Sequence, residues 1–215
     1  MTLTVAVHPS MNGIIVINYP GFGGDIDGYR QKYKRLAGFV QDNVGAVARL
    51  SNVYHPDLHY SHSCVNDLRA VVEYVCQHGV DICGAREPRI FIMAISAGGS
   101  AAAVIAHEFP GVERLLLVAP SDDAGFEAIA SGLRLFCGQL FIAVGKQDEV
   151  VGTDLARQLC SLADKASSRR LEIIDGCDHM FMGRRNGRIL SSLPMWAFRD
   201  DAPAPSEERG IDIYD

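Results

Sequence analysis

Three residues of this chain, Ser96, Asp148 and His179, have the types and the order that nucleophilic catalysis requires. A serine hydroxyl is a weak nucleophile, and it becomes reactive when a base takes its proton and a third group orients that base. Histidine serves as such a base, and a carboxylate can orient it. Each of the three residues follows an apolar run typical of a buried strand. The sequence therefore predicts an acyl-transfer site with Ser96 as the nucleophile.

Ser96 lies between an apolar run at 89–95 and a stretch of small residues. A nucleophile on a sharp strand-to-helix turn needs small residues two positions before and after it, and Ala94 and Gly98 meet this need. Glycine is the usual residue at the first of these positions, but alanine is also small enough. A serine that only caps a helix would give the same local pattern. The interpretation of Ser96 as a nucleophile therefore rests on Asp148 and His179 as well.

Asp148 and His179 come from loops after the apolar runs 139–145 and 170–174. Asp148 ends the segment Gly-Lys-Gln-Asp, and His179 lies within Gly-Cys-Asp-His-Met-Phe. The three candidates are separated by 52 and 31 residues. Four other carboxylates could orient the histidine. The glycine three positions before Asp148, Gly145, and the hydrophobic Val150 two positions after it favour Asp148 over these four. These alternatives are Asp122, Asp123, Asp175 and Asp178.

The order Ser, Asp, His, with each residue after a strand, resembles the α/β-hydrolase superfamily. The likeness is to small esterases without lids and to dienelactone-hydrolase-like members, and it covers residues 10–198. The resemblance implies that Ser96 is the nucleophile, Asp148 the acid and His179 the base. It also implies an oxyanion hole formed by the backbone N–H groups of Phe22 and Ala97.

A glycine-rich loop, Asn-Tyr-Pro-Gly-Phe-Gly-Gly, follows the apolar run 13–18. The resemblance assigns it to the oxyanion loop, with Tyr19 and Pro20 in place of the family's usual histidine. We expect Tyr19, Gly21 and Gly23 to contact the substrate. A dinucleotide fingerprint is excluded by spacing, because Ile26 stands where its third glycine would be. The segment after Ser96 also lacks the lysine of a phosphate-binding loop.

The rest of the chain predicts the scaffold, an α/β fold with a mostly parallel central sheet and helices on both faces. Only 19 residues separate two of the later strands, which leaves no room for a large cap domain. We expect one domain over 1–198 and a polar tail over 199–215 that is mobile or docked on the surface. The predicted strands are 3–7, 13–18, 46–51, 89–95, 114–119, 139–145 and 170–174. The predicted helices are 28–43, 63–79, 97–108, 124–134, 152–165 and 187–198, with Ser63 as a possible cap of the second.

Composition narrows the class of protein. The 215 residues are 48% hydrophobic and carry a net charge of −6, which fits one globular domain and argues against a nucleic-acid partner. We find no apolar stretch that would span a membrane and no secretory leader, so we expect a cytoplasmic protein. The six cysteines form no C-x-x-C pair, so no zinc site is predicted.

Several further polar residues could contribute to a binding site. His55, His59 and His62 could hold a metal ion if they lay on one helix, but Pro56 argues against this, and we expect His55 to line the pocket instead. Arg184 follows His179 and could favour an acidic substrate. The basic cluster at 32–35 is predicted to be a solvated helix face.

These observations predict a serine hydrolase that cleaves a carboxylic ester or thioester of a small-molecule or acylated substrate, without a metal or an organic cofactor. The same three residues would also serve an acyltransferase or an amide-cleaving enzyme. A binding protein that kept the fold and lost the reaction is an alternative of another class. The sequence leaves the acyl group and the oligomeric state open.

Overall fold

The computed structural model describes residues 3–53, 60–200 and 202–214, and for residues 60–62 it describes the backbone alone. Within this part of the chain, seven strands form one sheet in the order β1-β3-β2-β4-β5-β6-β7. β1 runs antiparallel to β3, and all other neighbours are parallel. The strands are β1 Val5–His8, β2 Ile14–Tyr19, β3 Ala46–Leu50, β4 Arg89–Ile95, β5 Val112–Val118, β6 Gln139–Gly145 and β7 Ser168–Ile174.

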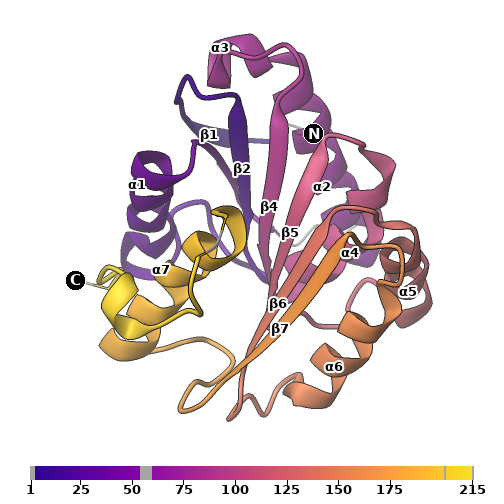
Figure 1. Ribbon diagram of the computed structural model, residues 1–215, viewed down its shortest axis with the longest axis vertical. Helices are drawn as coiled ribbons and strands as arrows, with labels where there is room; N and C mark the ends of the chain where they lie inside the picture. The colour runs from indigo at the N-terminus through magenta and orange to yellow at the C-terminus, as the bar shows by residue number, and fades with distance from the viewer. Residues whose placement is uncertain (1–2, 54–59, 201, 215) are drawn as a thin grey trace.

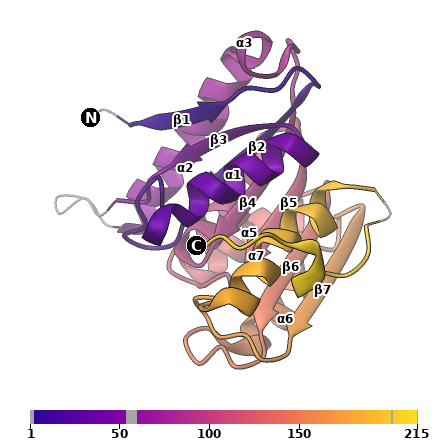
Figure 2. The same ribbon diagram turned by 90° about the vertical axis from the view of Figure 1, so that its left-hand side faces the viewer.

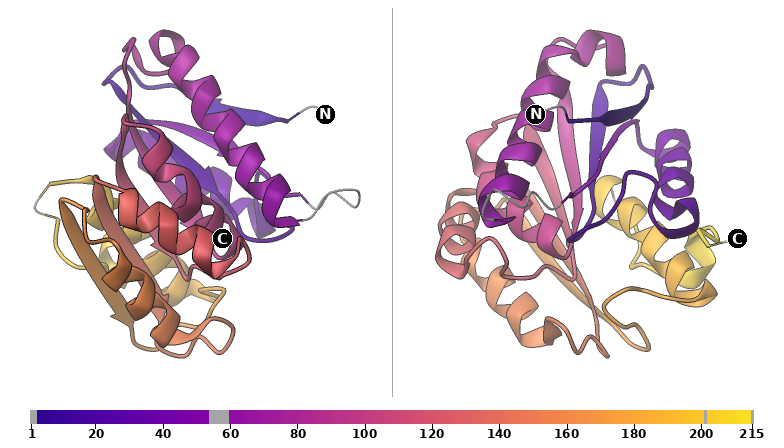
Figure 3. Two further views of the ribbon diagram at one scale, coloured as in Figure 1. Left: turned by 90° about the vertical axis from the view of Figure 1, so that its right-hand side faces the viewer. Right: turned by 180° about the vertical axis from the view of Figure 1, so that it is seen from behind.

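Helices cover both faces of this sheet (Figure 1). α1 and α7 lie on one face, as Figure 2 shows, and α2, α4, α5 and α6 lie on the other, as the left view of Figure 3 shows. The fold is therefore the three-layer arrangement that the alternating pattern predicted. The helices are α1 Lys32–Asn43, α2 Tyr60–Gln77, α3 Gly79–Cys83, α4 Ala97–Ile105, α5 Phe126–Leu135, α6 Gly152–Leu162 and α7 Arg184–Phe198.

The central strands are apolar along most of their length because both of their faces are buried. In β2, Ile15 and Ile17 point into the core beneath α2, α4, α5 and α6, whereas Val16 points into the core beneath α1 and α7. Successive side chains of a strand alternate between the two faces, so a strand covered on both sides shows no polar alternation. This explains why the strands were readable from the sequence as continuous apolar runs.

α4 lies close to its neighbours because it consists almost entirely of small residues. A side chain at Gly132 of α5 would bring its Cβ within 2.2 Å of the carbonyl oxygen of Ala103 in α4. The two helices thus pack backbone against backbone at this point. The close packing fixes the helix that begins directly after Ser96.

Several helices differ in their bounds from the sequence-based expectation, among them α1 and α2. α1 begins at Lys32 rather than at residue 28, because Gly28, Arg30 and Gln31 have φ values of 72°, 51° and 62° and cannot continue a right-handed helix. The helix predicted over 63–79 begins earlier, at residue 60, and ends at 77, where the short α3 follows. Ser63 therefore lies inside α2 and does not cap it.

The last residues of the chain pack on α7 and α1 (Figure 2). The Ser191 hydroxyl donates a hydrogen bond of 3.0 Å to the carbonyl oxygen of Ile211. Arg35 of α1 reaches the carbonyl oxygen of Ile213 at 3.4 Å, and the Ile213 side chain is fully buried. The segment 202–214 is thus docked on the helices that cover one face of the sheet.

Candidate active site

The loops that follow β4, β6 and β7 meet at the carboxyl edge of the sheet, at the bottom of the view in Figure 1. Ser96 follows β4 directly, Asp148 lies three residues after β6, and His179 lies five residues after β7. Ligands of open parallel sheets bind at this edge, because the loops that can surround them converge there. The three sequence-predicted residues are therefore brought to one place.

Their side chains form a continuous hydrogen-bonded chain. The Ser96 Oγ lies 3.0 Å from the His179 Nε2, and the His179 Nδ1 lies 2.9 Å from the Asp148 Oδ2. The Asp148 side chain is fully buried and the His179 side chain is 11% exposed. A nucleophile in contact with a base, and that base in contact with a buried orienting carboxylate, is the arrangement that acyl transfer requires.

The backbone at Ser96 is strained, with φ 51° and ψ −122°. This conformation is rare for a residue with a side chain, and such strain is concentrated at functional sites. The Ser96 hydroxyl makes no capping hydrogen bond to α4, so the alternative that it only caps this helix is not supported. A side chain at Gly98 would place its Cβ 2.3 Å from the carbonyl oxygen of Pro20, which explains the need for glycine there.

The Asp148 loop is held by the carboxylate itself. The Asp148 Oδ1 accepts hydrogen bonds from the backbone N–H groups of Val150 at 2.9 Å and Val151 at 3.0 Å, which leaves Oδ2 for His179. Gly145 is needed at the end of β6 because a Cβ there would lie 2.2 Å from the carbonyl oxygen of Cys177. The two loops can therefore cross at close range. Among the residues that the structure describes, the other candidate acids make no hydrogen bond to His179; these are Asp122, Asp123, Asp175 and Asp178.

The glycine-rich loop lies against Ser96. A Cβ at Gly21 would come within 3.0 Å of the Ser96 Cβ. Asn52 anchors both ends of the loop, since its side-chain amide donates to the Pro20 carbonyl at 3.1 Å and its backbone N–H donates to the Gly24 carbonyl at 2.8 Å. The sequence analysis missed Asn52, whose position just after β3 is its only sequence signal. These two hydrogen bonds hold the loop beside Ser96.

The two residues predicted to form the oxyanion hole come from different elements near Ser96. Ala97 is the first residue of α4, and its backbone N–H makes no hydrogen bond within the described part of the chain. Phe22 lies at the tip of the glycine-rich loop, where 59% of the residue is exposed. A free N–H at the start of a helix is a suitable donor for a developing oxyanion.

A pocket of about 520 Å³ opens beside Ser96 and His179. Its walls come from the glycine-rich loop, from the segment around the start of α1, from residues 180–181 and from Leu190 of α7. Gly21 and Gly23, the predicted substrate contacts, and Phe22, the predicted oxyanion donor, lie in its lining. α5 packs on α4 and contributes nothing to the lining, so no cap from the β5–β6 connection covers the pocket.

The sequence analysis misread Lys32, which also lines the pocket. The cluster 32–35 was predicted to be a solvated helix face, but Lys32 is only 6% exposed. Its burial depends on Tyr33 and on Tyr214 at the far end of the chain, whose rings lie within 6 Å of its ammonium group. Contacts between such distant segments leave no signal in the local pattern.

Two predicted substrate contacts have other roles, and a third lies outside the described residues. Tyr19 is fully buried, and its hydroxyl donates a hydrogen bond of 3.0 Å to the Cys64 carbonyl, so it packs in the core rather than in the pocket. Arg184 is exposed at the start of α7, where it pairs with Asp212 at 3.1 Å, and it does not line the pocket. His55, like His59, falls in the segment that the structure does not describe.

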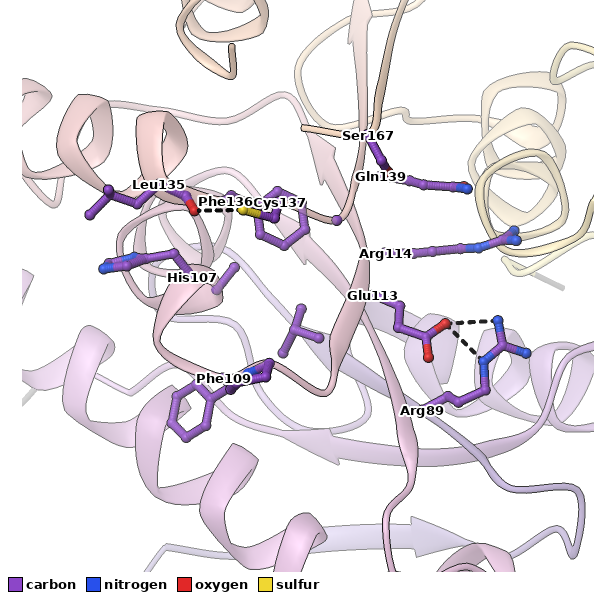
Figure 4. A pocket seen from close by; sticks show the side chains of 14 residues that line it. Arg89, His107, Phe109, Glu113, Arg114, Leu135, Phe136, Cys137, Gln139 and Ser167 are labelled. Atoms are coloured by element: carbon purple, nitrogen blue, oxygen red, sulfur yellow. Dashed lines mark hydrogen bonds and ion pairs between the residues drawn. The ribbon is translucent and has the colours of Figure 1, made fainter. Parts of the chain in front are cut away.

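A second pocket, also of about 520 Å³, lies at the opposite edge of the sheet (Figure 4). Its charged groups are paired with each other or with neighbouring residues. Arg89 pairs with Glu113 at 2.8 Å, as the dashed lines in Figure 4 show, and Arg114 pairs with Asp200. None of its lining residues is a nucleophile with a base in contact. The hydrogen-bonded chain of Ser96, His179 and Asp148 borders the first pocket and not this one.

Two further classes of site were sought in the described residues. No group of three or more histidine, cysteine, aspartate or glutamate side chains is arranged there to hold a metal ion. None of the helices described combines the length and the apolar character needed to cross a bilayer.

Comparison with known proteins identifies the fold as that of the α/β hydrolases. Dienelactone hydrolase from Anabaena variabilis superposes with a TM-score of 0.72 at 18% identity, over 92% of this chain and 93% of that one. Est1E from Butyrivibrio proteoclasticus gives 0.69 at 15% identity, over 88% and 90% of the two chains. An alpha-beta serine hydrolase homologue from Coxiella burnetii gives 0.63 at 21% identity, over 83% and 84%.

No protein-family model and no curated protein sequence matches the chain. The chain has the α/β-hydrolase fold that its motifs predicted. At these identities the likeness establishes the fold alone, so the activity has to be argued from the site.

Proposed function

We propose that this protein is a serine hydrolase that cleaves a carboxylic ester or thioester through an acyl-enzyme on Ser96. The observation that carries the proposal is the chain of contacts from Ser96 Oγ through His179 to the buried Asp148 carboxylate, at 3.0 and 2.9 Å. The similarity in fold to esterases and to a dienelactone hydrolase supports the same reaction class.

In the proposed mechanism, His179 takes the proton of Ser96 as the Oγ attacks the ester carbonyl carbon. Asp148 accepts a hydrogen bond from the His179 Nδ1–H, which fixes the tautomer in which Nε2 is free to receive the proton. The same carboxylate stabilises the imidazolium that forms. The backbone N–H groups of Phe22 and Ala97 stabilise the oxyanion of the tetrahedral intermediate.

The second half of the reaction follows the same path with water as the nucleophile. His179 gives its proton to the leaving alcohol or thiol, and the acyl group remains on Ser96. His179 then takes a proton from water, and the resulting hydroxide attacks the acyl carbonyl carbon. Collapse of the second tetrahedral intermediate returns the proton to Ser96 and releases the acid. No metal or organic cofactor takes part in these steps.

Labelling with a fluorophosphonate probe tests the proposal directly, since the probe reacts only with an activated serine. We expect the wild-type protein to be labelled and Ser96→Ala to be unlabelled. Ser131→Ala, a matched change at an exposed serine of α5, should keep full labelling. A wild-type protein that resists the probe would contradict the proposal and favour a binding protein. Labelling that persists in Ser96→Ala would show that another serine is the nucleophile.

A further inference from the structure

Lys32, the first residue of α1, is a buried cation in the lining of the pocket beside Ser96. Its Nζ lies 5.0 Å from the centre of the Tyr33 ring and 5.9 Å from that of Tyr214. Its ammonium group forms no hydrogen bond and no ion pair with any residue that the structure describes. Burial lowers the pKa of the Lys32 ammonium group from its usual value, and no carboxylate offsets this.

A lysine that is only 6% exposed and has no counter-ion is unusual, because partial removal of its charge from water is unfavourable. Its Nζ keeps contact with the solvent in the pocket, where a ligand can reach it. Contact with two aromatic rings recovers about 0.5–2 kcal/mol each. The nearest protein carboxylate in the lining, Asp25, is exposed, and its Oδ1 accepts hydrogen bonds from the backbone N–H groups of Asp27 and Gly28. Among the described residues, the Lys32 charge thus has no counter-ion in the space that a substrate would enter.

Two neighbouring features add to the positive potential at this end of the pocket. The first turn of α1 contains no acidic residue, so the positive end of the helix dipole is not neutralised there. The Tyr33 side chain also lines the pocket, and its hydroxyl has no hydrogen-bond partner among the described residues. Burial raises the pKa of this hydroxyl, which therefore remains a donor at neutral pH.

We propose that the pocket binds esters that carry a second, free carboxylate, and that this carboxylate pairs with the Lys32 ammonium group while the ester lies at Ser96. The inference rests on the proposed hydrolase function and specifies its substrate class. One ammonium with one hydroxyl donor matches the single charge of a carboxylate. A phosphate group carries more charge and is bound by several cationic or backbone donors, which this pocket does not gather.

Binding to the Ser96→Ala variant tests this proposal without turnover. The ligands are the monomethyl esters of succinic, glutaric and adipic acids, each compared with its uncharged dimethyl ester by calorimetric or NMR titration. We expect the best-fitting monoester to bind about ten- to a hundredfold more tightly than its dimethyl counterpart. The chain length with the largest ratio then measures the span from the ester site to Lys32.

The preference should depend on Lys32 and not on the overall charge of α1. Adding Lys32→Met, or Lys32→Gln as a second variant, should reduce the ratio of the two dissociation constants to about one. Lys34→Met is the matched control, since Lys34 is an exposed lysine of the same helix, and it should keep the ratio. A ratio that survives loss of Lys32, or that falls equally in Lys34→Met, would overturn the proposal.

The two proposals fail in different ways. Hydrolysis of the monoesters and the diesters at equal efficiency, with equal binding, would retain the hydrolase and refute the carboxylate site. A carboxylate preference in binding, together with no fluorophosphonate labelling and no hydrolysis by the wild-type protein, would retain the Lys32 site and refute the hydrolase. If the protein shows neither hydrolysis and labelling nor a preference for the monoesters in binding, both the hydrolase and the Lys32 carboxylate site are refuted.

Discussion

The Tyr214 hydroxyl donates a hydrogen bond of 3.2 Å to the backbone carbonyl oxygen of Phe181, two residues after His179. Phe181 has a φ of 51°, so the loop that carries the histidine turns through a strained conformation at this point. Tyr214 is buried against α1 and α7 at the end of the docked segment 202–214. The end of the chain therefore braces the loop that presents the proposed catalytic base.

Replacement of this tyrosine should weaken the site without altering its chemical groups. We expect Tyr214→Phe to lower stability by about 1 kcal/mol and to slow fluorophosphonate labelling of Ser96 severalfold. Burial, and next the charge of Asp178, raise the pKa of Tyr214 to about 12, so the hydroxyl remains a donor through the neutral range and the effect should not vary with pH between 6 and 9.

Two measurements check this expectation, thermal unfolding and the labelling rate. The matched control is Tyr74→Phe, at a half-exposed tyrosine of α2 that stacks on His78. Equal labelling rates in Tyr214→Phe and in the wild-type protein would mean that the brace has no influence on His179.

Gly145 should not tolerate a side chain. A Cβ at this position would lie 2.2 Å from the Cys177 carbonyl oxygen, so alanine must push apart the loops that hold Asp148 and His179. We expect Gly145→Ala to lose most of the hydrolytic activity and about 1–3 kcal/mol of stability. Gly38→Ala, within α1, meets nothing within 4 Å and should raise stability by about 0.5–1 kcal/mol. Enzyme assays measure the loss of activity, and denaturant unfolding of both variants measures the change in the free energy of unfolding.

Asp148→Asn separates the structural and the electrostatic roles of the proposed acid. The Asn Oδ1 can still accept from the N–H groups of Val150 and Val151, so the loop should fold as before. The amide group facing His179 cannot accept from Nδ1–H, and the histidine is held in the wrong tautomer. We expect kcat to fall by about 10³–10⁴-fold with little change in thermal stability.

Asp122→Asn is the control for this change, because Asp122 follows β5 and was one of the two alternative acids there, with Asp123. It is exposed and should retain full activity. An Asp148→Asn variant with nearly normal kcat, or an Asp122→Asn variant with the larger loss, would show that the acid has been assigned to the wrong residue.

The sequence was informative where local rules decide the structure. β4 is apolar after Arg89 because both faces of the sheet are covered, and Gly98 is required by the loop that passes beside it. The order of Ser96, Asp148 and His179 was readable because parallel strands bring their carboxyl ends to one edge. The three side chains come together because β4, β5, β6 and β7 are parallel neighbours in the sheet. No sequence pattern linking the three distant positions was needed to predict this.

The sequence failed where a distant segment decides the environment. Lys32 stands in a polar stretch and was predicted to be solvated, yet Tyr214, 182 positions later, covers it. Arg184 was given the role of an anion contact because it is near His179 in sequence, but it pairs with Asp212 outside the pocket. Tyr19 was placed in the pocket by its neighbours in the loop, although strand alternation points its ring into the core.

The uncompensated charge of Lys32 predicts a stability effect that is independent of any ligand. Lys32→Met keeps the length of the side chain and removes a buried charge, so we expect a gain of about 1–2 kcal/mol at pH 7, or a rise in Tm of about 2–8 °C. The gain should shrink as the pH rises. Because the pKa of Lys32 is lower in the folded chain, the unfolded chain binds more protons between that lowered value and the usual 10.5, and the stability of the wild type rises with pH across this window.

The difference between the two unfolding free energies, measured from pH 7 to pH 10.5, isolates this one group, since the other titrating residues are common to both proteins. Lys34→Met should show no such pH-dependent difference, because its side chain is exposed. A Lys32→Met protein that is less stable than the wild type at pH 7 would mean that the ammonium group is stabilised by its surroundings. The carboxylate of a substrate would then have no uncompensated charge to meet.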